Sequence, residues 1–103
     1  PAPAGKEVFE LAAVDTPPRP LANLAPVYPP RARMRGIEGS VVLEFTVTAE
    51  GTVESVDVVE ARPGETFVNS AVQAVERWRF EPGKVDGKPV ATRVRQKVEF
   101  KLE

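Results

Sequence analysis

The side chains best suited to chemistry in this sequence are carboxylates. The 103 residues contain no histidine and no cysteine, so the usual proton shuttle and the thiolate nucleophile are absent. Glu44, Glu54 and Asp57 could imitate the acid pair of a glycosidase. Alternation along a strand would scatter these three side chains, and the sequence has no glycine-rich phosphate-binding loop. We therefore predict a protein that is not an enzyme and that has no catalytic residue, metal site or cofactor.

The charged residues are unevenly distributed along the chain. The formal net charge of −1 argues against a general nucleic-acid binder. From Glu38 to Glu60 there are six acidic residues and no basic one, whereas Lys84 to Glu103 contains six basic and three acidic residues. Two interpretations stay open: neighbouring strands whose outward charges neutralise each other, or a basic binding edge.

The N-terminal quarter of the chain has its own composition. Eight of the eleven prolines lie in the first thirty residues, which favours extended backbone over helix. We expect residues 1–25 to be a Pro-rich lead-in, the end of a linker, and residues 26–103 to be one domain. Within the lead-in, Glu7 to Leu11 alternates and could add as an extra strand to its own domain or to a neighbour, where it would occupy a binding edge. The chain lacks an initiator methionine and reads as part of a longer protein.

The pattern of residues 29–78 predicts a short helix, two strands and a longer helix, in that order. Residues 29–34 suit a short helix closed by Gly36. Residues 39–51 form a half-buried strand and its turn, and residues 52–60 a second strand whose irregular alternation predicts a bulge. Residues 67–78 carry an apolar helical stripe.

A long final strand completes the predicted fold. Residues 90–103 alternate between a mainly apolar face and a charged face, and Gln96 is the one sizeable polar residue on the apolar face. We expect an α+β fold in which two helices cover one face of a three-stranded antiparallel sheet. Thr66 or a neighbour is expected to cap the longer helix.

Trp78 is the single tryptophan and lies at the end of the predicted longer helix. Arg77 and Arg79 flank it and Phe80 follows, so the segment could be a stacking platform for a ligand or a structural junction. A platform needs several exposed aromatic side chains on one surface. Most aromatic residues here already occupy predicted core positions, which favours the junction.

Several short motifs together resemble the C-terminal domain of the TonB energy transducers. They are Tyr28-Pro29 ahead of the short helix, Gly39 at the start of the hairpin, Gly51 in its turn, and the run "WRFEPG" at residues 78–83. The similarity extends from about Pro26 to Leu102 and includes the closing strand.

The resemblance implies a machine that spans two membranes. Such proteins are held in the inner membrane by an N-terminal anchor, act with ExbB and ExbD, and cross the periplasm on a Pro-rich linker. Their C-terminal domain binds the TonB box of an outer-membrane transporter and couples the proton motive force to uptake. The alternative is a TonB-like interaction domain used in envelope signalling, secretion or structural linkage.

The resemblance also implies where the partner binds, namely on the last strand and just ahead of the first helix. The residues expected to contact the partner are Val27, Tyr28, Pro29, Thr92, Arg93, Val94, Arg95, Gln96 and Lys97. Gly39, Gly51, Trp78 and Phe80 are expected to be structural. For Tyr28, packing at the start of the first helix is an equal alternative. The chain would act as a monomer or as a strand-exchanged homodimer, since a free strand edge favours exchange.

Overall fold

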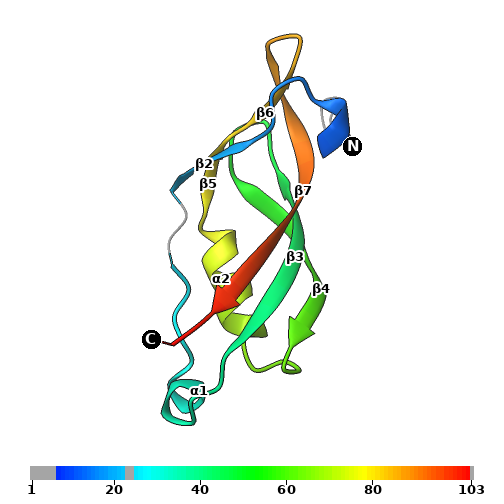
Figure 1. Ribbon diagram of the computed structural model, residues 1–103. Coiled ribbons are helices and arrows are strands. Elements are labelled where there is room, and N and C mark those ends of the chain that lie inside the picture. Colours follow the sequence, from blue (N-terminus) through cyan, green and yellow to red (C-terminus); the bar gives the residue numbers. More distant parts are fainter. Residues whose placement is uncertain (1–6, 23–24, 103) are drawn as a thin grey trace.

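Three long strands and a helix that packs against them organise the fold (Figure 1). The computed structural model describes residues 7–22 and 25–102. Its elements are, in chain order, β1 (Val8–Glu10), the short 3-10 helix η1 (Leu11–Ala13), β2 (Arg19–Ala22), α1 (Pro30–Met34), β3 (Gly39–Val47), β4 (Val53–Arg62), α2 (Val68–Glu76), β5 (Arg79–Glu81), β6 (Gly83–Val85) and β7 (Lys88–Phe100). No helix in the described ranges has the length and apolar character needed to cross a bilayer.

The sheet runs in the order β1-β7-β3-β4, and β3 is antiparallel to both of its neighbours. This confirms the predicted α+β fold with a three-stranded antiparallel sheet. β6 forms a hairpin with the start of β7, and β2 and β5 form a separate antiparallel pair. These three strands have only three or four residues each and were not predicted, because alternation carries no signal at that length.

β1 bears out the expectation for Glu7 to Leu11. It pairs in parallel with Ala91–Arg93 of β7, so the lead-in contributes an extra strand to its own domain. In Figure 1 the chain passes from β1 across the β6–β7 hairpin, below its tip, to β2 on the other side of β7.

β4 contains the predicted irregularity. Its register against β3 shifts between Val42 and Leu43 and again between Glu44 and Thr46, and Ser55 has a positive φ of 57°. After these bulges Val58 and Val59 are 43% and 44% exposed, so the apolar residues at the end of β4 are not core residues.

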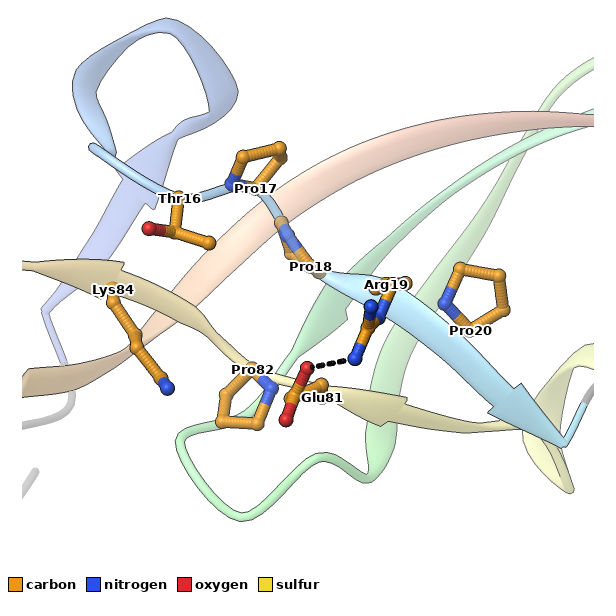
Figure 2. A pocket seen from close by; sticks show the side chains of 8 residues that line it. All are labelled: Thr16, Pro17, Pro18, Arg19, Pro20, Glu81, Pro82 and Lys84. Atoms are coloured by element: carbon orange, nitrogen blue, oxygen red, sulfur yellow. Dashed lines mark hydrogen bonds and ion pairs between the residues drawn. The ribbon is translucent and has the colours of Figure 1, made fainter.

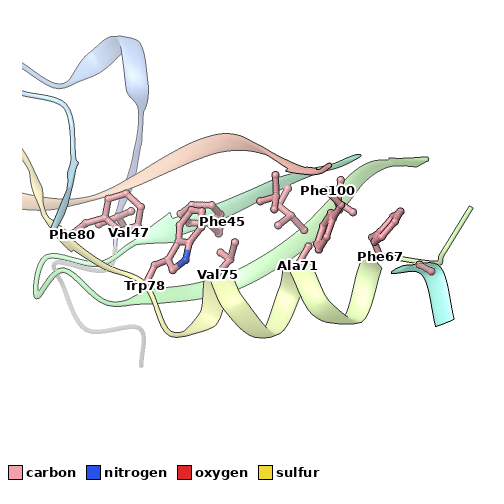
Figure 3. Close-up of a cluster of buried hydrophobic side chains, with 12 residues drawn as sticks. Phe45, Val47, Phe67, Ala71, Val75, Trp78, Phe80 and Phe100 are labelled. Carbon is pink, nitrogen blue, oxygen red and sulfur yellow. The ribbon is translucent and has the colours of Figure 1, made fainter. Parts of the chain in front are cut away.

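The core lies between α2 and the inner face of the sheet (Figure 3). Phe67 and Phe100 stack with ring centroids 4.4 Å apart, and Phe45 meets Trp78 edge to face at 6.5 Å. Ala32 of α1 is also buried in this cluster, which places the short helix against it as well. The residues of β3 that face α2 are fully buried, as the alternation predicts: Val41, Leu43, Phe45 and Val47.

The two ends of α2 differ in how well the sequence predicted them. The expected Thr66 cap is wrong: the residue that precedes the helix is Phe67, and it makes no side-chain cap hydrogen bond. Its ring is fully buried, so burial of an apolar residue fixes the start of the helix where a polar cap was expected. At the other end the Arg79 guanidinium donates to the carbonyl oxygen of Trp78 at 3.1 Å, which suits the negative end of a helix. Trp78 and Phe80 are 7% and 8% exposed, so both rings lie in the core at this end of the helix.

Candidate functional site

β7 has one filled edge and one partly open edge. β3 pairs with it from Thr92 to Phe100 on one side. On the other side β1 covers Ala91–Arg93. Within residues 7–22 and 25–102, no strand pairs with this second side from Val94 to Phe100. We call Val94–Phe100 the open edge, because its outward amides and carbonyls are available to another extended chain.

The predicted β7 contacts fall into two groups. Thr92 and Arg93 are paired with β3 and with β1 at once, so their backbones are not on the open edge. Thr92 is also fully buried. The other predicted residues, Val94 to Lys97, do lie on the open edge.

The two arginines of β7 are bound to acids of neighbouring strands. The Arg93 guanidinium donates to the Ser55 carbonyl at 2.6 Å and to the Thr46 hydroxyl at 3.2 Å, and it forms an ion pair with Asp57. Arg95 pairs with Glu44 at 2.7 Å. These pairs confirm that the acidic and basic segments neutralise each other across strands.

The same pairs determine how much each arginine stabilises the fold. The side chain of Arg93 is 21% exposed and that of Arg95 is 62% exposed. We expect Arg93→Ala to lower the free energy of unfolding by about 1–2 kcal/mol, because it leaves the Ser55 carbonyl and Thr46 hydroxyl without their donor. Arg95→Ala should cost less than about 0.5 kcal/mol, as for other exposed pairs. Urea denaturation of the two variants measures the difference, and equal losses would contradict this ranking.

Lys97 of the open edge is paired within its own strand. Lys97 lies 3.4 Å from Glu99 on its own strand, and both side chains are about half exposed, at 57% and 48%. Gln96 donates its side-chain amide to the Lys97 carbonyl at 2.9 Å. Lys97 therefore keeps its charge close to the surface on which an incoming strand would lie.

An apolar pocket opens beside the start of the open edge. It has a volume of about 190 Å³ and is bordered by Val94 and Gln96 of β7. Its floor and walls come from the core and the lead-in: Phe45, Trp78, Phe80, Leu11, Pro17, Pro18 and Pro20. An apolar side chain projecting from a strand on this edge would find an apolar surface here.

A larger, shallower cavity lies where the lead-in crosses β5 and β6 (Figure 2). It measures about 340 Å³ and four prolines line it: Pro17, Pro18, Pro20 and Pro82. Arg19 and Glu81 form a 2.7 Å ion pair across it, with side chains 72% and 47% exposed. The cavity lies between two segments of this chain. The charges of Arg19 and Glu81 neutralise each other.

The three predicted contacts ahead of α1 have different surroundings. Val27 is 74% exposed, whereas Tyr28 packs edge to face on Phe67 and Phe100 at 5.5 and 5.8 Å. The Tyr28 hydroxyl donates to the Ile37 carbonyl. Pro29 stands directly before the first residue of α1. The contacts of Tyr28 support the packing alternative, while its role toward a partner stays a prediction.

Tyr28 gives the fold a dependence on alkaline pH. Partial burial raises the pKa of its hydroxyl above the ordinary 10.0, the Glu38 carboxylate adds to the rise, and the Arg33 guanidinium opposes it. The folded state thus favours the neutral hydroxyl, so this contribution is complete below pH 10 and is lost as pH rises through the folded pKa. We expect the stability of the wild type to fall more than that of Tyr28→Phe between about pH 9 and pH 11. Parallel curves of unfolding free energy against pH would contradict this.

The carboxylates considered for catalysis are engaged or dispersed. Arg95 holds Glu44, and Arg93 holds Asp57. No cluster of three or more potential metal-ligating side chains occurs in the described part of the chain. The features that sequence reasoning missed are β6 and the pairing of residues 15–20 with residues 80–86. Both depend on backbone bonds and leave no residue pattern.

Comparisons with known proteins agree with this geometry. The family model described as "Gram-negative bacterial TonB protein C-terminal" matches residues 25–102. The chain belongs to the TonB C-terminal domain family. It is 41% identical to Protein TonB of Pseudomonas aeruginosa over 85 residues, which are 82% of this chain and 25% of that protein. It is 39% identical to Protein TonB of Vibrio cholerae over 90 residues, 87% of this chain and 37% of that protein.

Solved TonB domains share the fold. The solution structure of the Pseudomonas aeruginosa TonB C-terminal domain aligns with a TM-score of 0.74 at 38% identity, covering 94% of this chain and 96% of that one. The TonB2 protein of Vibrio anguillarum aligns with a TM-score of 0.64 at 41% identity, covering 82% and 81%. This TonB-family chain spans between a quarter and about two fifths of the two curated relatives above.

Proposed function

We propose that this domain is the periplasmic part of a TonB-type energy transducer and that it binds the TonB box of an outer-membrane transporter by strand addition. The observation that carries the proposal is the open edge, Val94–Phe100, on a central strand of a TonB-family fold. An extended peptide that pairs there gains main-chain hydrogen bonds that do not depend on its side chains. Of the residues expected to contact the partner, such a strand would meet Val94, Arg95, Gln96 and Lys97 first.

The same edge suits the transmission of force. A strand that joins β7 becomes part of a sheet whose next strands, β3 and β4, are packed on α2. Load applied to the partner strand is then shared over a ladder of hydrogen bonds and not borne by one side chain. The proposed role is mechanical coupling, with no catalytic step by this chain.

The rest of the machine is proposed from the family. An N-terminal anchor in the inner membrane would connect this domain to ExbB and ExbD, with residues 1–25 as the end of the periplasmic linker and residues 26–103 as the binding domain. Residues 8–22 of that lead-in pack on the domain through β1 and β2. A strand-exchanged homodimer would compete for the same open edge.

Calorimetric titration tests the proposal. The probe is a synthetic peptide that contains the TonB box of a Pseudomonas aeruginosa outer-membrane transporter. We expect a dissociation constant of roughly 1–100 μM. The control peptide carries a proline at the centre of the box, which removes a ladder donor without altering this chain, and its binding should be at least about tenfold weaker. Equal binding of both peptides would rule out strand addition. Sedimentation of the free protein reports whether a dimer already fills the edge.

A further inference from the structure

The lead-in is attached to the domain unevenly. Residues 15–20 are held by a series of bonds to the β5–β6 segment. The Asp15 amide donates to the Lys84 carbonyl at 2.8 Å, the Lys84 amide donates to the Thr16 carbonyl at 2.9 Å, and the Asp86 amide donates to the Asp15 carboxylate at 2.6 Å. We call residues 15–20 the clasp.

β1 is far less secure than the clasp. It pairs with β7 over three residues only, and none of its side chains is buried. Val8 is 46% exposed and Leu11, directly after the strand, is 48% exposed. The turn that follows contains a long backbone bond, from the Val14 amide to the Leu11 carbonyl at 3.4 Å. Releasing β1 therefore exposes little new apolar surface and breaks few bonds.

β1 also lies where an incoming strand would extend. It pairs with Ala91–Arg93 on the same side of β7 as the open edge, because β3 occupies the opposite side at Thr92 and Arg93. η1 then turns away, and Leu11 forms part of the wall of the apolar pocket beside Val94 and Gln96. A partner strand that pairs with the open edge and extends beyond Val94 toward Arg93 would collide with the end of β1.

We propose that β1 is a displaceable strand that covers the first part of the partner-binding edge and is released when a partner pairs with β7. The inference rests on the proposed function and names a regulation of that same site. On release the edge lengthens from Val94–Phe100 to Ala91–Phe100, while the clasp keeps its bonds to Lys84 and Asp86. Val14, which joins η1 to the clasp, is the pivot of the movement.

The clasp explains how so short a strand can compete. Glu10 and Asp15 are separated by only a few residues, so β1 remains close to β7 even after release. A tether of this kind gives the free strand an effective concentration of the order of millimolar. β1 then competes with the partner for pairing with β7. A weakly binding partner does not displace it, whereas a longer partner strand does.

A disulfide lock tests the proposal directly. Val8 and Ala91 are register partners, and adjacent strands bring α-carbons to a spacing that a disulfide can bridge. The chain has no other cysteine, so the double variant Val8→Cys/Ala91→Cys forms one defined bond. We expect the oxidised form to bind the TonB-box peptide at least about tenfold more weakly than the reduced form. The single variants Val8→Cys and Ala91→Cys are the matched controls and should bind like wild type under both conditions.

A second variant and a second readout complete the test. Phe9→Pro weakens the β1 pairing without a lock and should lower the dissociation constant about three- to tenfold. In the wild type, addition of the peptide should speed amide exchange at Val8–Glu10 while Asp15 and Thr16 keep their protection. Peptide binding that leaves β1 protected, or that ignores the oxidised lock, overturns the displaceable strand and leaves the proposed function intact. Absence of peptide binding in every form overturns both.

Discussion

Phe45→Ala is expected to lower the free energy of unfolding by about 3–5 kcal/mol, which is a large part of the total for a domain of this size. Phe45 is fully buried at the centre of β3. Its ring centroid lies 6.5 Å from that of Trp78 and 5.8 Å from that of Phe80 (Figure 3). The truncation leaves a cavity where the helix end, the sheet and the β5 segment meet, and none of these can collapse without moving the others.

Equilibrium denaturation in urea measures the Phe45 effect. The control is Val59→Ala on β4, because Val59 is an apolar strand residue that is 44% exposed. It should cost less than about 1 kcal/mol. A loss below about 2 kcal/mol for Phe45→Ala would mean that the junction around Trp78 is loosely packed, contrary to the structure.

Gly51→Ala is expected to cost about 3 kcal/mol or more. Gly51 has φ of +88° in the β3–β4 turn, and a β-carbon there would lie 2.1 Å from the Phe80 carbonyl oxygen. The left-handed backbone alone costs a non-glycine residue about 1–2 kcal/mol. The clash adds to this, because Phe80 is bound to Gly51 by its own amide, which donates to the Gly51 carbonyl at 2.8 Å.

Gly64→Ala is the matched control for Gly51→Ala. Gly64 also has a positive φ, of +52°, but nothing lies within 4 Å of a β-carbon at that position. It should show only the backbone cost of about 1–2 kcal/mol. Thermal unfolding compares the two, and each kcal/mol corresponds to roughly 4–8 °C in Tm for a domain of this length. Equal shifts would show that the turn is not tied to Phe80.

Long elements with a clear period could be predicted from the sequence. Burial alternates with the sequence in β3 from Val41 to Phe45 and in β7 from Lys97 to Phe100, and the stripe from Phe67 to Trp78 faces the core. The family motifs at Gly39, Gly51 and Trp78 also have visible structural causes. A β-carbon on Gly39 would lie 2.0 Å from the Arg62 carbonyl oxygen.

The elements that were missed depend on interactions between distant segments. β5 and β6 flank Pro82 and are too short for a pattern. β5 pairs with β2 of the lead-in, and β6 pairs with the start of β7 and has one bridge to Thr16. The Thr66 cap failed because the fully buried Phe67 ring takes the position before α2. Tertiary packing there outweighed a local preference.

The candidate site was predicted in outline. The alternation of β7 indicated an exposed charged face, and Val94–Lys97 do lie on an open edge. The sequence could not show that Thr92 and Arg93 are covered, because that depends on β1 finding a parallel register on β7. The sequence also could not show whether Arg93 and Arg95 contact a partner or stabilise the fold. The acidic residues with which they pair lie on other strands.

Residue-resolved amide hydrogen exchange, with and without the TonB-box peptide, tests the central claim most directly. The account predicts that outward amides of Val94–Phe100 slow at least about tenfold on peptide addition, as expected for newly paired strand groups. The amides of β4, at the other end of the strand order, should not change. New protection along β4 or α2, with none on β7, would contradict the account.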